Sequence, residues 1–120
     1  MICGCYNYAG HACPFPAVMP SGGGEQGMRL CRVEYEGFEG GYYLHERLPL
    51  RDCDIYYDDR KNDILVLFSG YIYNKKELVS GYGINDSDPE PVIAAAMFLK
   101  EGPCFVEKLN GDFSIFICRP

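Results

Sequence analysis

The chain has 120 residues, 48% of them hydrophobic and 23% charged, which excludes a disordered or coiled-coil protein and predicts one domain, or part of one, with a core. Its 17 acidic and 11 basic residues give a net charge of -6, and no basic cluster could neutralise phosphates, so we expect no nucleic-acid partner. No apolar run approaches the roughly 20 residues of a membrane-spanning helix, and the N-terminus lacks the basic region of a signal peptide. We therefore expect a soluble, cytoplasmic protein without a membrane partner.

Extended segments are expected over most of the first half of the chain. The apolar patterning predicts strands at residues 2–8, 30–35, 41–50, 54–57 and 63–68. The last of these is rich in leucine and valine, which favours a strand buried on both faces. The polar residues 58–63 predict a turn that joins the final two strands into a hairpin. Prolines and glycines make residues 9–27 a predicted flexible loop.

Helices are expected in the second half. The best defined begins at the cap residue Asp88, continues through Pro89 and ends at Gly102. The apolar residues at helical spacing predict a buried stripe with two further residues beside it: Val92, Ala96 and Leu99, then Ile93 and Met97.

Two shorter helices are predicted at 74–80 and 104–108, and a core strand with apolar residues on both faces at Gly111–Cys118. Strands, then helices, then a strand predict an α+β fold or a layered sandwich rather than a doubly wound parallel sheet. The last strand ends two residues before the C-terminus, so either the domain is minimal or the chain is part of a longer one. An exposed apolar edge strand favours pairing, so we expect an oligomer or a complex.

Cys3 is the first candidate for chemistry. A cysteine at a free N-terminus combines a thiol nucleophile with an amine whose reference pKa, about 8, lets it act as a base at neutral pH. Cys3 reaches this position only if Met1 and Ile2 are removed; otherwise it is a small apolar residue in a strand. Because the other cysteines, at 13, 31, 53, 104 and 118, show no CxxC spacing, we expect no metal and no cofactor.

Five short blocks occur in one order along the chain, at residues 3–4, 45–52, 68–78, 87–90 and 109–116. They read Cys-Gly, His-Glu-Arg-Leu-Pro-Leu-Arg-Asp, Phe-Ser-Gly-Tyr-Ile-Tyr-Asn-Lys-Lys-Glu-Leu, Ser-Asp-Pro-Glu and Leu-Asn-Gly-Asp-Phe-Ser-Ile-Phe. Together they resemble the class II glutamine amidotransferase domain at the N-terminus of asparagine synthetases. That family has Met-Cys-Gly, His-x-Arg-Leu-x-Ile-x-Asp, Phe-Asn-Gly-Glu-Ile-Tyr-Asn, Ser/Thr-Asp-Thr-Glu and Leu-Asn-Gly-x-Phe-Ala-Phe. The blocks span almost the whole chain but only the front part of the family's domain.

The resemblance implies an N-terminal-nucleophile hydrolase fold, an αββα sandwich of two antiparallel sheets flanked by helices. It also implies a reaction in which a thiol attacks the side-chain amide of glutamine, forms a thioester and releases ammonia to a synthetase domain or subunit. By position, Cys3 would be the nucleophile. Gly70 would donate its backbone N–H to the oxyanion, and Ser69 stands where the family has a second oxyanion donor.

The same resemblance implies a glutamine pocket. Arg47 would bind the α-carboxylate, Leu50 of the same block would belong to the pocket, and Asp88 would pair with the α-ammonium. Both charged residues also have structural alternatives, since Arg47 could be a surface strand residue and Asp88 a helix N-cap.

The sequence departs from the family at several positions. Ser69-Gly70-Tyr71 replaces Asn-Gly-Glu, so a hydroxyl stands in place of the amide that helps to stabilise the oxyanion. The family's Arg-Gly-Pro-Asp segment is absent before Leu30. Two hypotheses follow: a processed, glutamine-hydrolysing enzyme, or an inactive amidotransferase-like scaffold that supports an amide-forming synthetase or a peptide cyclase.

Overall fold

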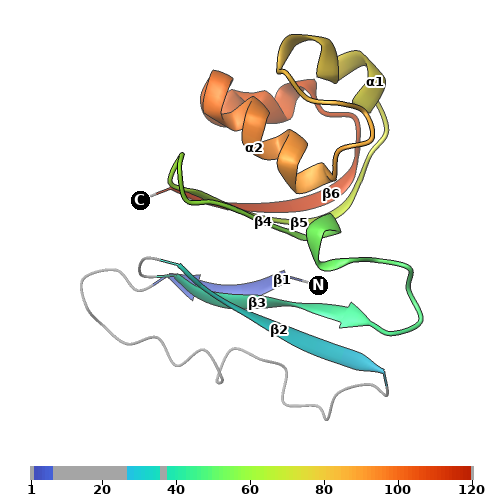
Figure 1. Cartoon of the computed structure of the whole chain (residues 1–120), viewed down its shortest axis with the longest axis vertical. Coiled ribbons are helices and arrows are strands. Elements are labelled where there is room, and N and C mark those ends of the chain that lie inside the picture. Colours follow the sequence, from blue (N-terminus) through green and yellow to red (C-terminus); the bar gives the residue numbers. More distant parts are fainter. Residues whose placement is uncertain (1, 7–26, 36–37, 120) are drawn as a thin grey trace.

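Two three-stranded antiparallel sheets and two α-helices make up the described part of the chain (Figure 1). This computed structural model describes residues 27–35 and 38–119 with their side chains and residues 2–6 by their backbone. The first sheet has the order β1-β3-β2, with β1 at Ile2–Tyr6, β2 at Met28–Tyr35 and β3 at Phe38–His45. The second has the order β4-β5-β6, with β4 at Tyr56–Asp59, β5 at Ile64–Ile72 and β6 at Gly111–Cys118.

The helices are α1 at Lys75–Leu78 and α2 at Glu90–Glu101. In the described ranges three 3₁₀ segments accompany them, η2 at Asp52–Asp54, η3 at Val79–Gly81 and η4 at Gly102–Lys108. Figure 1 shows both α-helices over the outer face of the second sheet, so the layers run helices, second sheet, first sheet. Within the described ranges, no helix has the length and apolar character needed to cross a lipid bilayer.

Strand β5 lies at the centre of the packing. Residues 64–68 of this strand have no exposed surface, and their side chains alternate between two cores. Leu65 and Leu67 enter the core between the two sheets. Val66 and Phe68 enter the core between the second sheet and α2. A strand buried on both faces is therefore confirmed.

Aromatic stacking joins the two sheets. The ring of Phe38 at the start of β3 stacks on that of Phe116 in β6, with 4.3 Å between centroids. The ring of Tyr42 lies 6.2 Å from that of Tyr56 in β4. These contacts fix which parts of the two sheets face each other.

The mixed fold with antiparallel sheets is confirmed, and so is the hairpin, because β4 pairs with β5 around a turn at 60–63. The third strand was predicted at 41–50 and that range is wrong, since β3 ends at His45. The ring Nδ1 of His45 accepts the N–H of Arg47 at 3.1 Å, and the N–H of Glu46 donates to the Gly27 carbonyl at 2.8 Å. The chain therefore turns at 46–48.

The fourth strand begins two residues later than predicted. The range 54–57 is replaced by β4, because residues 52–54 form η2. The carboxylate of Asp54 accepts the N–H of Arg51 at 2.8 Å and holds this turn closed. The predicted loop at 9–27 lies outside the described residues, apart from Gly27.

Helix α2 is confirmed, but most of the predicted stripe lies on the side of the helix opposite its buried face. Ile93 and Met97 are fully buried, whereas Val92, Ala96 and Leu99 are only half-buried. The buried set also includes Pro91, Ala94 and Ala95, so small side chains that add little apolar surface let this face of α2 approach β5 closely.

The predicted helix cap is also wrong. The N-cap of α2 is Pro89, because Asp88 uses its carboxylate to accept the N–H of Asn85 at 2.8 Å. The predicted helix at 74–80 consists of α1 followed by η3, and the one at 104–108 lies within the longer 3₁₀ segment η4.

Candidate functional site

The predicted site residues come from four different segments. Two of these are strands of facing sheets, one is the turn after β3, and one is the loop before α2. Cys3 lies in β1, and Ser69 and Gly70 lie in β5. Arg47 and Leu50 lie in the turn and the residues that follow β3, and Asp88 lies in the loop before α2.

The strand that carries Cys3 lies against the strand that carries Ser69 and Gly70. In the first sheet Cys3 is paired with Gly41 of β3. Cα atoms of β1 and β5 approach within 8 Å of each other. The structure thus brings together the strands of the predicted nucleophile and of the predicted oxyanion donors.

Gly70 is held in a conformation that other residues rarely adopt, with φ at 122°. It pairs with Phe113 of β6, and a Cβ built on it would lie 2.7 Å from the Phe113 Cα and closer still to the Asp112 carbonyl oxygen. Only glycine therefore fits between β5 and β6 here, whether or not its N–H serves a ligand.

Arg47 projects from the turn after β3. It is exposed, and its guanidinium makes no hydrogen bond or ion pair with any residue in the described ranges. Its backbone N–H is the group that His45 accepts. A cation without a protein partner can bind an incoming carboxylate without first breaking an ion pair.

Leu50 lies at the edge of the core between the sheets and lines an open pocket of about 390 Å³. The other lining residues include Arg29, His45 and Glu46, so the pocket carries charged groups of both signs next to apolar surface. The pocket lies where β3 ends and next to the turn that carries Arg47.

Asp88 stands apart from Arg47 in the loop before α2. Besides accepting the Asn85 N–H with its carboxylate, it donates its own N–H to the Asn85 carbonyl at 3.1 Å, which closes a turn. Its carbonyl oxygen accepts the Lys75 ammonium at 3.3 Å. The described contacts include none between Asp88 and Arg47.

An acidic residue of the second block has contacts that the sequence did not reveal. The carboxylate of Asp52 accepts the Tyr42 hydroxyl at 2.8 Å and lies 3.6 Å from the guanidinium of Arg29. Burial of the ring, followed by the hydrogen bond to Asp52, raises the pKa of Tyr42 well above its usual range. Asp52 is the last residue of the block at 45–52, and its place in that block is the one feature of the sequence that could have marked it as a site residue.

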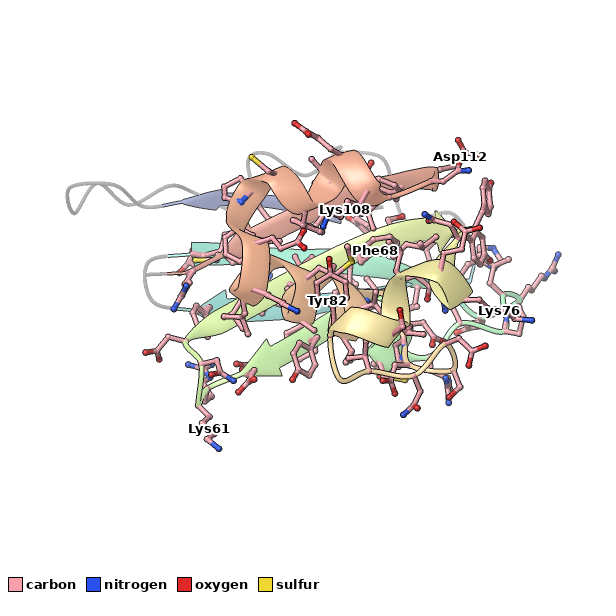
Figure 2. The ribbon with its side chains drawn as sticks, turned by 90° about the horizontal axis from the view of Figure 1, so that it is seen from above. Lys61, Phe68, Lys76, Tyr82, Lys108 and Asp112 are labelled. Carbon is pink, nitrogen blue, oxygen red and sulfur yellow. The ribbon has the colours of Figure 1, made fainter. Side chains whose placement is uncertain are left out.

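The third and fifth blocks bind each other. The side-chain amide of Asn74 donates to the Lys108 carbonyl and accepts the N–H of Asn110, both at 2.9 Å. The Tyr73 hydroxyl donates to the Asp112 carboxylate at 2.7 Å. Figure 2 shows Asp112 at the end of the molecule opposite Lys61 of the β4–β5 turn, so these contacts close the end of the second sheet that carries Ser69 and Gly70.

No group of three or more metal-ligating side chains is present in the described ranges. No protein-family model matches the chain, and a comparison with curated proteins found no significant match.

Proposed function

We propose that the chain is a class II glutamine amidotransferase-like domain that hydrolyses glutamine through Cys3 and supplies ammonia to an asparagine-synthetase-type partner. The observation that carries this proposal is the packing of β1 against β5, with Cys3 on one strand and the Ser69-Gly70 pair on the other. Two face-to-face antiparallel sheets with helices on one side are compatible with part of an N-terminal-nucleophile hydrolase.

In the proposed reaction the Cys3 sulfur attacks the side-chain carbonyl carbon of glutamine. The C–S bond forms as the C–N bond breaks, and the thiol proton passes through the terminal amine to the departing ammonia. Water then attacks the thioester, releases glutamate and restores the thiol. Because the amine must be free, the proposal requires removal of Met1 and Ile2.

Two donors would stabilise the negative charge that develops on the carbonyl oxygen. These are the N–H of Gly70 and the hydroxyl of Ser69, both in β5. Glutamine itself would be held by Arg47 at its α-carboxylate, with Leu50 against its aliphatic part. Asp88 would bind the ammonium through its Oδ1 atom, since the Asn85 N–H occupies only Oδ2.

An inactive scaffold is the second candidate, and Asp88 is the specific observation in its favour. A carboxylate that closes a turn has a structural role without any ligand. In this reading the domain would support an amide-forming synthetase or a peptide cyclase through contacts alone.

Intact mass spectrometry with a chloroketone analogue of glutamine separates the two candidates. Two forms are compared, the full sequence and a cleaved fusion that begins at Cys3. We expect a single adduct on Cys3, and release of glutamate from glutamine, in the form that begins at Cys3. Cys3→Ala should abolish both, whereas Cys104→Ala, which removes an exposed thiol, should change neither.

Equal labelling of the exposed thiols Cys53 and Cys104, with no preference for Cys3 and no glutamate formed, would contradict the enzyme and leave the scaffold. Glutamate release that survives Cys3→Ala would refute the assignment of the nucleophile.

A further inference from the structure

Strand β5 has a neighbouring strand on both sides along only part of its length. On one side β6 pairs with it as far as Ile72. On the other side the pairing with β4 stops at Leu67, and one further hydrogen bond joins the Phe68 N–H to the Ile55 carbonyl at 2.8 Å. The residues before Ile55 form η2 instead of a longer strand. In the described part of the chain, residues 69–72 of β5 therefore have a strand on one side only.

The backbone of Ile72 faces the side that β4 leaves open. Along an antiparallel strand, residues whose N–H and C=O bond to one neighbour alternate with residues whose groups face the other way. The Tyr73 N–H donates to the Asn110 carbonyl at 2.7 Å, on the β6 side, so the groups of Ile72 face away from β6. Gly70 lies two residues earlier and presents its N–H and C=O on the same side.

Ile72 is buried, with 4% of its surface exposed. Its backbone N–H and C=O nevertheless make no hydrogen bond with any residue that the structure describes. Buried backbone groups are nearly always paired, because an unpaired one costs free energy. The edge of β5 at Ile72 is therefore suited to receive the backbone of another extended segment.

An open pocket of about 370 Å³ gives access to this edge. It is lined by Ile72 and Tyr73 at the end of β5, by residues of α1 that include Lys76, and by Asp86 of the loop before α2. Figure 2 shows Lys76 at the same end of the molecule as Asp112. The pocket carries charges of both signs, so we expect a polar side chain, rather than an apolar one, to enter it from a bound segment.

Two exposed tyrosines flank Ile72 on the opposite face of the strand. Tyr71 is 58% exposed and Tyr73 64% exposed. Leu67 precedes them on the same face and lies in the core between the sheets, so the tyrosines stand where the first sheet no longer covers the second. Aromatic residues pair favourably with β-branched residues across antiparallel strands. A strand added beside β5 should therefore place apolar residues opposite these two rings.

We infer that the free edge of β5 at residues 70–72 binds an extended segment of a partner protein as an added antiparallel strand. The segment carries two apolar residues, opposite Tyr71 and Tyr73, separated by a polar residue that exchanges both backbone hydrogen bonds with Ile72. This inference does not depend on glutamine hydrolysis, and it gives the scaffold candidate a defined surface. A segment that also pairs with Gly70 would occupy the N–H proposed to bind the oxyanion.

The test uses amide NMR spectra of the full chain and the peptide acetyl-Ser-Val-Thr-Val-Ser-amide. In the free chain the Ile72 amide hydrogen should exchange with solvent at least about tenfold faster than that of Tyr73, which is hydrogen-bonded. The peptide should shift the Ile72 signal and slow this exchange. N-methylation of the central threonine removes the N–H that pairs with the Ile72 carbonyl and should weaken binding at least about fivefold. N-methylation of the first valine, whose N–H points away from β5, should change binding less than about twofold.

Two protein variants complete the test. Tyr71→Ser should weaken peptide binding about threefold or more, whereas Val106→Ser, at an exposed apolar residue of η4, should leave it unchanged. Circular dichroism confirms that both variants fold. Equal affinity of the two N-methylated peptides would refute strand addition, and so would an Ile72 signal that does not move in millimolar peptide. Signals of residues 70–72 that shift with protein concentration alone would assign the edge to a second copy and overturn the partner segment. Each of these refutations leaves the proposed glutaminase standing, because none measures glutamate formation.

Discussion

Replacing Gly70 by alanine tests the close approach of β5 and β6 at the candidate site. An alanine Cβ would lie 2.7 Å from the Phe113 Cα and 2.9 Å from the Asp112 carbonyl carbon. Two carbon atoms are in favourable contact at roughly 3.5 Å, so the nearer contact is about 0.8 Å too short. Both neighbours are backbone atoms of the paired strand, which cannot move aside as a flexible side chain could.

Two costs add at this position. Forcing the strands apart costs about 2–3 kcal/mol, the upper part of the range for overpacking changes because both neighbours are backbone atoms, and a non-glycine residue at positive φ costs about 1–2 kcal/mol more. The expected loss is about 3–5 kcal/mol of the free energy of unfolding, out of a typical total of about 5–15 kcal/mol. For a domain of this length, this corresponds to a fall in Tm of roughly 12–20 °C.

Two other glycines provide matched controls. Gly83 has φ at 68° but open space around its Cα, so Gly83→Ala should cost only the backbone strain, about 1–2 kcal/mol. Gly81 has neither positive φ nor a close neighbour, so Gly81→Ala should change stability by less than about 1 kcal/mol. Urea unfolding followed by far-UV circular dichroism measures all three. A Gly70→Ala loss within about 1 kcal/mol of that of Gly83→Ala would refute the described pairing of β5 with β6.

Three further predictions concern the contacts that hold the helical layer and the turns in place, each measured by urea unfolding. Asn74→Ala removes both side-chain hydrogen bonds to the loop before β6 and should cost about 1–2 kcal/mol, whereas Asn85→Ala, whose amide makes no described contact, should stay within about 0.5 kcal/mol of the parent. Lys75→Met leaves the half-buried Glu90, 3.0 Å away, without its ion-pair partner and should cost about 1–2 kcal/mol; an equal loss in the exposed control Lys76→Met would show that the pair is not the cause. The hydrogen bond from the Arg51 guanidinium lowers the pKa of Asp54, so ionised Asp54 stabilises the fold above its unfolded pKa of about 4, and this contribution is lost as the pH falls through the lower folded value. The stability difference between the parent and Asp54→Asn should therefore shrink below about pH 4, and a difference that is constant from pH 7 to pH 2.5 would contradict this role.

The sequence predicts the strand cores better than the strand ends. The apolar run at 63–68 identified β5, yet the strand continues to Ile72 through Ser69 and Gly70, two residues with low strand preference. Pairing with β6 overrides that preference. In the same way β3 begins at Phe38, before the predicted start at residue 41. Glycine at position 41 lets β3 approach β2 closely, because a Cβ there would lie 2.5 Å from the Cys31 carbonyl oxygen. The ends of a strand are decided by the strands that pair with it, and those partner strands can be distant in the sequence.

The candidate site could be predicted as a set of positions but not as a set of contacts. The blocks selected Cys3, Arg47 and Ser69 by their order along the chain, and the structure shows β1 packed against β5. The turn that engages the Asp88 carboxylate depends on a backbone N–H three residues earlier, which no side-chain pattern reveals.

Two of the five blocks have a packing role in this fold that does not depend on catalysis. Asn74 and Asn110 bind each other's segment, and Gly70 and Gly111 allow β5 and β6 to approach closely, since a Cβ on Gly111 would lie 3.1 Å from the Ile72 Cα. A scaffold with this fold would need these residues as much as an enzyme would. Arg47 is different, because its exposed guanidinium makes no described contact that packing could explain. A glutaminase and a scaffold with the same fold therefore differ in what they require at Cys3, Arg47 and Ser69. Substitutions at these three positions should affect glutamine hydrolysis far more than stability.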